Sequence, residues 1–283
     1  MTTGTDPDDF LGRSAEETRR LIDQAAIYDR YTLQMLEDAG IGSGMNVLDV
    51  GSGAGDVAIL AARRVGPAGT VVGIDVDPEV LVIARQRADS VGLTNVTFIQ
   101  GDFRTADLPD DFDAAIGRLV LMYAPDPAAA LKSVAAHVRP GGVVAFEDVD
   151  VRLWSIDEQA MPLLKRISRL PGDVATGSGA HPDVGQRLHA AFMDAGLGVP
   201  RMSGFIPLGG GPDWPGYAYL AAGIRNMLPT IERLGLSTRA ELEVDTLATR
   251  LEEEVTRSGL PMMCPPHISA WARKPHIAAS RDR

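Results

Sequence analysis

The sequence predicts an α/β fold in which a mostly parallel β-sheet carries helices on both faces. Short apolar runs alternate with amphipathic segments from about residue 45 onward, which is typical of repeated βαβ units. Asp-Pro pairs stand where two helices should begin, and glycine or proline follows the segments where helices should end. The chain has 283 residues, of which 45% are hydrophobic, so it can bury a large core.

Five strands are expected in the first half of the chain, each followed by a helix or a loop. The first strand leads into a glycine-rich loop, and helical patterns follow the first, second and fourth of these strands. Parallel strands need such crossover helices, so these five should lie in one sheet. The expected strands cover residues 45–50, 70–75, 96–102, 112–118 and 143–150.

Capping residues mark the helices between these strands. The first helix should begin near Asp56 and stop at Gly66, where glycine accepts the left-handed conformation. Asp77 and Asp126, each followed by proline, should cap the two later helices. The second of these is rich in alanine and is expected to end at residues 139–142.

After residue 150 helices dominate the pattern. A helix over residues 152–170, a glycine-rich loop and a second helix over 183–196 are expected, and the second helix should bury Val184, Leu188 and Phe192. Two late strands, 201–208 and 267–274, flank two further helices and bring the sheet to seven strands. Upstream, residues 14–40 form a helical stretch that starts from the capping pair Ser14 and Glu17.

These patterns divide the chain into three parts. We expect a helical N-terminal lid over residues 1–42 and a ligand-binding core over 43–150. Residues 151–283 should supply the helices that cap a substrate and the last two strands of the same sheet.

Composition limits the kind of partner. The formal net charge of −11 argues against a nucleic-acid partner, because phosphate backbones are bound by clustered Lys and Arg. Cys264 is the only cysteine, so a disulfide within the chain is excluded and a reducing cytoplasm fits. The first residues lack the apolar segment of a signal peptide, and no apolar run is long enough to insert in a membrane. We expect a cytoplasmic protein.

The loop "LDVGSGAGD", residues 48–56, carries the main functional signal. Gly51, Gly53 and Gly55 follow the first strand, as in loops that close on a phosphate at a helix N-terminus. A dinucleotide motif would need glycine where Asp56 stands, and a carboxylate facing a pyrophosphate there would cost about a few kcal/mol. A ligand with adenosine, no phosphate and cationic groups avoids this conflict. S-adenosylmethionine is such a ligand.

Carboxylates also stand where the next strands end. Asp75 ends the second expected strand, about twenty residues after the loop, the spacing at which a carboxylate meets a ribose. Asp102 ends the third strand. Parallel sheets bind ligands beyond these strand ends, so Asp49, Asp75 and Asp102 should lie near one site.

Four segments in order carry a resemblance to a known family. "VLDVGSGAGD" (47–56), "GIDVDPEVL" (73–81), "VTFIQGDF" (96–103) and "VRPGG" (138–142) resemble the class I S-adenosylmethionine-dependent methyltransferases, over roughly residues 45–150. The resemblance implies a Rossmann-like, seven-stranded, mostly parallel sheet and S-adenosyl-L-methionine as the cofactor. It implies methyl transfer by in-line displacement at the sulfonium.

The resemblance also implies roles for individual residues. Gly51 and Gly53 would line the methionine moiety, Asp75 would bind the ribose hydroxyls and Asp102 the adenine amino group. Phe103 would border the adenine, Arg118 and Leu119 would offer backbone to the ammonium, and Asp49 would orient the loop or reach the ammonium through water. Asp49 and Asp56 have the alternative of capping a helix. The full expected cofactor set is Tyr28, Asp49, Gly51, Ser52, Gly53, Asp75, Val76, Gly101, Asp102, Phe103, Arg118 and Leu119.

Departures from subfamily patterns reduce the range of molecules that could accept the methyl group. The segment "GRLVLMYAPDP" (117–127) lacks the Asn/Asp-Pro-Pro-aromatic pattern of enzymes that methylate nucleobase amino groups. Arg118 stands where the catechol type has a metal-binding aspartate, and the histidines lack ligand spacing, so no metal is expected. The helical additions suit an enclosed pocket for a small, largely hydrophobic metabolite or natural product, as in secondary metabolism. Trp154, Trp214, Met262 and Met263 are candidates for its walls.

Three residues are candidates for contact with the reacting groups. His181 titrates near neutrality and lies in a loop that could fold over the cofactor, although a histidine before proline is often only a turn residue. Asp148, at the end of the fifth strand, could bond the acceptor or cap a loop. Tyr31 lies with Tyr28 on the helical stretch over residues 14–40, called the front helix below, and could close over the cofactor or pack in the core.

Rival functions stay open at this stage. The same cofactor motifs would serve a relative that uses the bound sulfonium as a scaffold for cyclisation, and quinone- or sterol-type C-methyltransferases share the resemblance. An NAD-dependent oxidoreductase is disfavoured by Asp56. Whether oxygen, nitrogen or carbon is methylated does not follow from the sequence, and the front helix could serve as a lid or as a homodimer contact.

Overall fold

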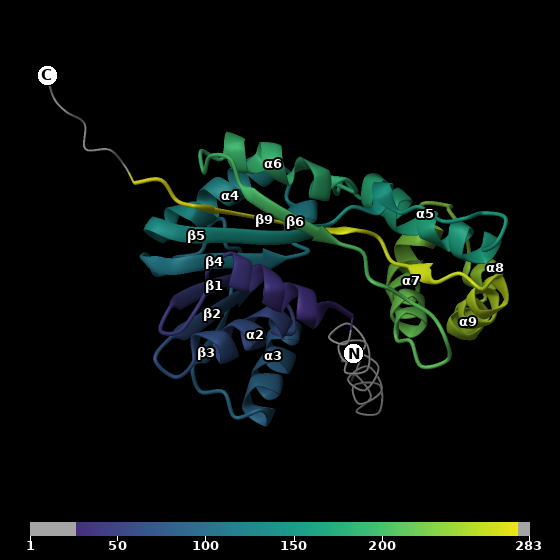
Figure 1. Cartoon of the computed structure of the whole chain (residues 1–283), viewed down its shortest axis with the longest axis horizontal. Coiled ribbons are helices and arrows are strands. Elements are labelled where there is room, and N and C mark those ends of the chain that lie inside the picture. The colour runs from purple at the N-terminus through teal and green to yellow at the C-terminus, as the bar shows by residue number, and fades with distance from the viewer. Residues whose placement is uncertain (1–26, 277–283) are drawn as a thin grey trace, which may run out of the picture. The chain divides into compact units, whose positions relative to one another are not determined.

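Seven strands form one sheet, in the order β3-β2-β1-β4-β5-β9-β6, in a computed structural model that describes residues 27–276 (Figure 1). The strands β1 to β5 pair in parallel, whereas β9 is antiparallel to both β5 and β6. The predicted mostly parallel, seven-stranded sheet is therefore confirmed. The strands are β1 (Asn46–Val50), β2 (Thr70–Asp75), β3 (Val96–Gln100), β4 (Phe112–Arg118), β5 (Val138–Val149), β6 (Arg201–Phe205) and β9 (His267–Arg273).

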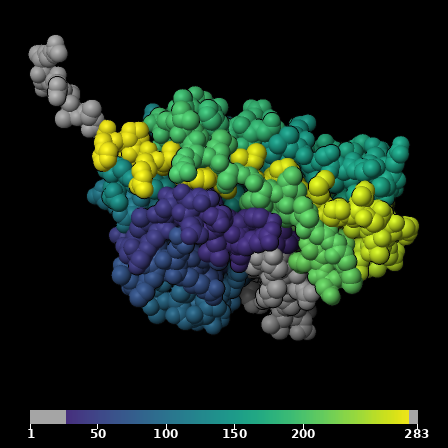
Figure 2. Space-filling view, viewed as in Figure 1, coloured from purple at the N-terminus to yellow at the C-terminus, as the bar shows by residue number. Residues whose placement is uncertain are grey.

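Helices cover both faces of this sheet, which explains why the central strands are apolar throughout. The helix over residues 27–38, α2 (Asp56–Val65) and α3 (Pro78–Ser90) pack on one face. The helices α4 (Pro127–Ala136) and α6 (Val184–Asp194) pack on the other. Figure 2 shows the purple segment with the first of these helices lying against the blue segment with α2 and α3.

The chain changes direction within the sheet at β1. β1 pairs with β2 on one side and with β4 on the other. The connections that leave the carboxyl ends of β1 and β4 therefore run to opposite sides, and a crevice opens between them. This is the position at which open α/β sheets bind ligands.

The predicted helix caps after β2 and β4 are confirmed. The side chain of Asp77 accepts a hydrogen bond from the Glu79 backbone at 2.9 Å, and that of Asp126 accepts one from Ala129 at 3.0 Å. Each is followed by a proline in the first turn. The predicted capping pair Ser14 and Glu17 lies outside the described residues.

The predicted boundary between α4 and the fifth strand was wrong. α4 ends at Ala136, and β5 begins at Val138 rather than at residue 143. Phe112 pairs with Val138, but Ala114 pairs with Val143, so residues between them form an irregularity inside the strand. The glycines that predict the end of a loop thus lie in a β-bulge. Glycine is needed there because an added Cβ at Gly142 would lie 2.5 Å from Val138.

The predicted helix at 152–170 was also wrong in its limits. Residues Val151–Leu153 form one 3₁₀ turn, and α5 spans Pro162–Gly177 with Pro171 inside it. The buried side chains of Leu164, Ile167 and Ala175 lie on one face of α5 on both sides of this proline. Their burial keeps residues 171–177 helical where the sequence predicts a loop.

The chain divides into two compact units built from separate segments. Within the described residues, the sheet unit comprises 30–154, 175–206 and 265–276, and the helical unit comprises 27–29, 155–174 and 207–264. The expected strand at 201–208 divides between them, because residues 208–209 form β7 (Leu208–Gly209), which pairs with β8 (Met262–Met263). The helical unit contains α7 (Gly216–Arg233), α8 (Arg239–Leu242) and α9 (Leu247–Ser258).

A buried carboxylate organises the helical unit. Glu254 of α9 is 9% exposed and accepts hydrogen bonds from the backbone of Leu163 and Leu164 in the first turn of α5, each at 2.8 Å. These amides lack partners within their own helix, so Glu254 satisfies them. Met262 and Met263, expected in a pocket wall, form the short β8 ladder of this unit.

Candidate active site

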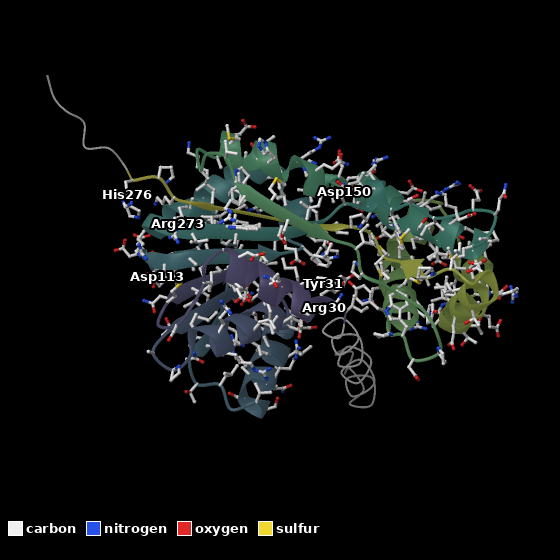
Figure 3. The ribbon with its side chains drawn as sticks, viewed as in Figure 1. Arg30, Tyr31, Asp113, Asp150, Arg273 and His276 are labelled. Carbon is white, nitrogen blue, oxygen red and sulfur yellow. The ribbon has the colours of Figure 1, made fainter. Side chains whose placement is uncertain are left out.

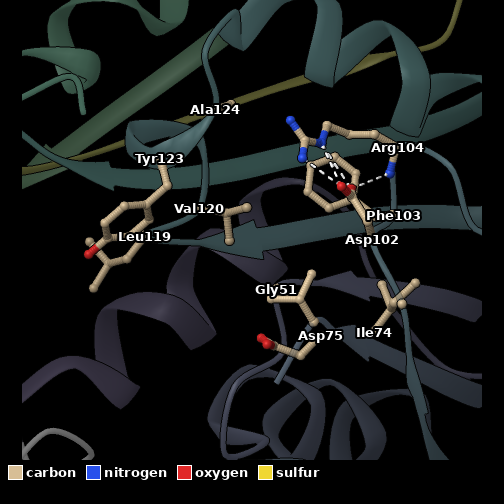
Figure 4. Close-up of a pocket in the computed structure, with 12 residues that line it drawn as sticks. Gly51, Ile74, Asp75, Asp102, Phe103, Arg104, Leu119, Val120, Tyr123 and Ala124 are labelled. Atoms are coloured by element: carbon tan, nitrogen blue, oxygen red, sulfur yellow. Dashed lines mark hydrogen bonds and ion pairs between the residues drawn. The ribbon is translucent and has the colours of Figure 1, made fainter. Parts of the chain in front are cut away.

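A cavity of about 340 Å³ opens at the carboxyl ends of β1 to β4 in the sheet unit (Figure 4). It lies at the change of strand direction, where the fold favours ligand binding. Seven of the twelve expected cofactor residues line it. The lining is Gly51, Ile74, Asp75, Val76, Gly101, Asp102, Phe103, Arg104, Leu119, Val120, Tyr123 and Ala124.

Gly51 of the glycine loop lines this cavity, whereas Ser52 and Gly53 are not among the lining residues. Gly51, Gly53 and Gly55 all have positive φ, at 63°, 50° and 83°. An added Cβ at Gly51 would lie 2.6 Å from Val120, whereas one at Gly53 would meet no atom within 4 Å. The surface beside Gly53 is thus an open cradle. Ser52 is buried below it, and within the described residues its hydroxyl has no hydrogen-bond partner.

Asp75 connects β2 to the glycine loop. Its Oδ2 accepts a hydrogen bond from the Gly53 backbone at 2.9 Å, and its Oδ1 accepts one from the Asp77 backbone at 3.0 Å. Each oxygen keeps a lone pair for a further donor. A fixed carboxylate on the cavity wall therefore stands where the sequence places it.

Asp102 carries a counter-ion that the sequence reasoning missed. Arg104 donates to its two oxygens at distances between 2.5 and 3.1 Å, and the Arg104 backbone adds a bond at 2.9 Å. These contacts hold the pKa of Asp102 below its usual value. An arginine two residues after a strand-end aspartate was the available signal.

The turn after β4 forms the opposite wall. Leu119 has φ of +59°, and its N–H donates to the Glu147 carbonyl at 2.8 Å. Asp148, fully buried, accepts from the backbone of Leu121 at 3.2 Å and Met122 at 3.4 Å. Burial raises the pKa of Asp148 to about 7. Asp148 thus positions the cavity wall and does not itself line the cavity.

His181 bonds to the same turn. Its backbone N–H donates to the Met122 carbonyl at 2.8 Å, and its ring Nε2 lies 3.4 Å from the Pro125 carbonyl. His181 is not among the residues that line the cavity. A catalytic part for it stays a prediction.

A buried layer of charges lies beneath the glycine loop. Asp56 pairs with Arg87 at 2.6 Å and with Arg118 at 3.5 Å, and Arg118 also donates to Thr32 at 2.9 Å. Gly55, not Asp56, is the N-cap of α2. Two arginines balance the charge of Asp56, so this charge alone does not explain why a diphosphate would be excluded.

Asp49 belongs to the same layer. It is 1% exposed, and burial raises its pKa to about 8, although Arg118 and a hydrogen bond from the Ala58 backbone act in the opposite direction. Its Oδ2 has no hydrogen-bond partner among the described residues. Asp49 lies beneath the loop rather than in the lining of the cavity.

The two tyrosines of the front helix have different surroundings. Tyr28 is 2% exposed and its ring packs edge-on against Tyr219 at 5.4 Å within the helical unit. Tyr31 stacks on Phe205 at 3.8 Å, and Arg30 lies over its other face and reaches its hydroxyl. Figure 3 shows Arg30 and Tyr31 side by side.

A second buried pair was missed by sequence reasoning. His267 Nδ1 lies 3.1 Å from Glu147 Oε1, and both side chains are at most 1% exposed. A carboxylate only accepts, so this ring nitrogen is the donor. The two residues are 120 positions apart, and only the pairing of β5 with β9 brings them together.

The described residues contain no group of His, Cys, Asp and Glu side chains arranged to hold a metal ion. Over the same range, no helix combines the length and the apolar character needed to cross a bilayer.

Comparison with known proteins identifies the family. A family model described as a methyltransferase domain matches residues 41–180. The ubiquinone/menaquinone biosynthesis C-methyltransferase UbiE of Pseudomonas putida is 33% identical over 185 residues, covering 60% of this chain and 71% of that protein. The chain belongs to the class I S-adenosylmethionine-dependent methyltransferases. S-adenosylmethionine is the cofactor of this family, as the sequence predicts.

Solved structures confirm the methyltransferase fold. The YcgJ protein of Bacillus subtilis matches with a TM-score of 0.54 at 19% identity, covering 87% of this chain and 99% of that one. The [4+2]-cyclase SpnF matches with the same TM-score of 0.54 at 21% identity, covering 87% and 80%. This chain spans between 29% and 52% of the first curated relatives that it matches.

Proposed function

We propose that this methyltransferase moves a methyl group from S-adenosylmethionine to a small, largely hydrophobic organic acceptor. One observation carries the proposal most directly. The cavity at the change of strand direction is lined by Gly51 of the glycine loop and by carboxylates from the ends of two neighbouring strands, Asp75 and Asp102, and the backbone at nearby Gly53 is open. A nucleoside with a short, flexible cationic tail matches this combination of groups.

The residues present fit that cofactor. The cradle at Gly53 leaves space that a Cβ would fill, so a ligand can approach the backbone there. Asp75 offers fixed acceptors for a pair of ribose hydroxyls. Asp102 and Phe103 line the neighbouring part of the cavity, where the adenine would lie.

When bound, the cofactor supplies an electrophilic methyl group on a sulfonium. The chain's own contribution is to bind, orient and exclude water. Asp148 fixes the turn Leu121–Tyr123 by accepting hydrogen bonds from its backbone. This turn carries Tyr123, which lines the cavity. His181 and Tyr31 are proposed to face the acceptor, and His181 would take a proton from an acceptor that carries one.

The acceptor class rests on exclusion and on similarity. A net charge of −11 disfavours a polynucleotide. The relative from Pseudomonas putida is named for a step in quinone biosynthesis, which is methylation of a small organic molecule. A small metabolite or natural product is therefore the acceptor class that we propose.

Incubation with cofactor labelled in its methyl group tests the proposal. The protein is mixed with a panel of small phenols, quinols, amines and carboxylic acids, and label is followed by mass spectrometry. Label in at least one acceptor, with S-adenosylhomocysteine released in equal amount, is the expected result. Product formed while all label stays on unreacted cofactor would instead support a non-methylating reaction such as cyclisation.

A further inference from the structure

The Asp102–Arg104 pair differs from an ordinary surface ion pair by its position. Both side chains line the cavity (Figure 4), and Asp102 is 29% and Arg104 46% exposed. Nε of Arg104 lies 2.9 Å from Oδ1, and Nη2 lies 2.5 Å from Oδ2. In the described part of the chain Nη1 has no partner, so donor capacity remains on the guanidinium.

This pair places a hydrogen-bond acceptor directly beside a donor. Oδ2 of Asp102 and Nη2 of Arg104 are in contact, and each has capacity for a further bond. A carboxamide offers the same combination, and Asn and Gln recognise adenine through it. On the edge of adenine the exocyclic amino group donates beside a ring nitrogen that accepts. A 6-oxopurine presents two acceptors along the corresponding edge.

We propose that Arg104 is a specificity-determining residue for the nucleobase of the cofactor. Asp102 accepts from the exocyclic amino group, and Arg104 donates to the adjacent ring nitrogen. Asp75 on the neighbouring strand would hold the ribose, which fixes the side from which the base reaches the pair. The inference rests on the proposed cofactor site and adds a residue to it.

The chain contains a matched pair away from the cavity. Arg139 bonds Asp113 at 2.7 Å with a comparable exposure of 43% for the arginine. Asp113 lies near the start of β4, whereas the cavity lies beyond the end of this strand, and Figure 3 shows Asp113 far from Tyr31. Arg139 is therefore a suitable control.

Calorimetry with two ligands tests the proposal. S-adenosylhomocysteine and S-inosylhomocysteine differ at position 6 of the base, where an oxo group replaces the amino group, and at N1, which carries a hydrogen in the oxo form. The wild-type protein should bind the adenosyl ligand at least about tenfold more tightly. Arg104→Met should lower the affinity for the adenosyl ligand about tenfold and the affinity for the inosyl ligand less. The ratio of the two affinities should therefore become smaller. Arg104→Lys should lose less of the affinity for the adenosyl ligand than Arg104→Met but not keep all of it, because a lysine ammonium lacks the planar set of N–H donors of a guanidinium.

Arg139→Met should leave both affinities unchanged, and circular dichroism confirms that each variant folds. Adenosyl affinity that is unchanged or tighter in a folded Arg104→Met variant would overturn the inference, since Arg104 would then be only a counter-ion of Asp102. That result would leave the proposed function intact. A wild-type protein that binds neither ligand would overturn the proposed cofactor site as well.

Discussion

The three loop glycines have positive φ, but they meet different surroundings. Gly51 and Gly55 are pressed against side chains, since an added Cβ would lie 2.6 Å from Val120 or 3.0 Å from Phe98. At Gly53 no atom lies within 4 Å of that position. Packing thus requires glycine at the first two positions, whereas at Gly53 the reasons are the backbone conformation and the access that a ligand needs.

Gly53→Ala should therefore separate binding from folding. We expect a loss of stability of about 1–2 kcal/mol, the cost of a side chain in the left-handed region, and a clear loss of affinity for S-adenosylhomocysteine. Gly92 is the control, because it has φ of +70° and equally free surroundings after α3. Gly92→Ala should lose similar stability in denaturant and keep full affinity. Equal affinities in both variants would contradict an open cradle at Gly53.

Asp49 lowers the free energy of unfolding at neutral pH. Its pKa of about 8 in the folded protein lies far above the ordinary value of 3.8, because burial disfavours its charge. Between these values the folded chain holds a proton that the unfolded chain has released. The stability that protonated Asp49 contributes is present below about pH 4 and is lost as the pH rises to about 8.

Asp49→Asn should remove this dependence. The variant's free energy of unfolding, relative to the wild type, should increase between pH 5 and pH 8 and stay level above it. Urea denaturation at a series of pH values measures the difference. A difference that does not change with pH would mean that Asp49 is already ionised in the folded protein.

At the level of elements, β9 joins β5 to the edge strand β6 through side chains as well as backbone. His267 of β9 bonds Glu147 of β5 at 3.1 Å, and Phe205 of β6 stacks on the His267 ring at 5.1 Å. Tyr31 of the front helix continues this stack. The carboxyl edge of the sheet is thus tied to the helix that covers one of its faces.

His267→Ala should destabilise the protein strongly, because it leaves the Glu147 carboxylate buried without its donor. A loss of about 3–5 kcal/mol is expected from chemical denaturation. Adding Glu147→Gln should recover part of this loss by removing the uncompensated charge. A double variant as unstable as the sum of the two single variants would contradict the pairing.

Several elements could be predicted from local sequence because their signals are local. Asp-Pro caps and apolar runs identified the parallel strands and the starts of α3 and α4. The start of β5 and the length of α5 could not be predicted, since they depend on pairing with β4 and on burial of one helix face. Glycine and proline weaken an element locally, but tertiary contacts decide whether it ends there.

For the whole molecule, the preference for S-adenosylmethionine over NAD needs a reason other than the charge of Asp56. That carboxylate is balanced by Arg87 and Arg118. Asp75 would hold a ribose in either class of ligand, and buried Asp49 holds a proton at neutral pH. We attribute the preference to the missing third glycine of the dinucleotide motif, whose position Asp56 occupies.

The two cofactor classes can be compared through thermal stability. S-adenosylhomocysteine at 100 times its dissociation constant should stabilise the folded protein by about 2.7 kcal/mol and raise the melting temperature. NAD at the same concentration should leave it unchanged. A rise with NAD and none with S-adenosylhomocysteine would be incompatible with the proposed site.

The sequence by itself determined the sheet class, the glycine loop and the strand-end carboxylates Asp75 and Asp102, because strand length and motif spacing place these residues at one edge. Only the tertiary structure decided that Arg104 engages Asp102, that two arginines neutralise Asp56, and that Glu147 meets His267. Most of these partners come from distant segments. Charge pairing depends on which side chains the fold brings within a few ångströms, and motif spacing carries no information about pairs that are far apart in the sequence.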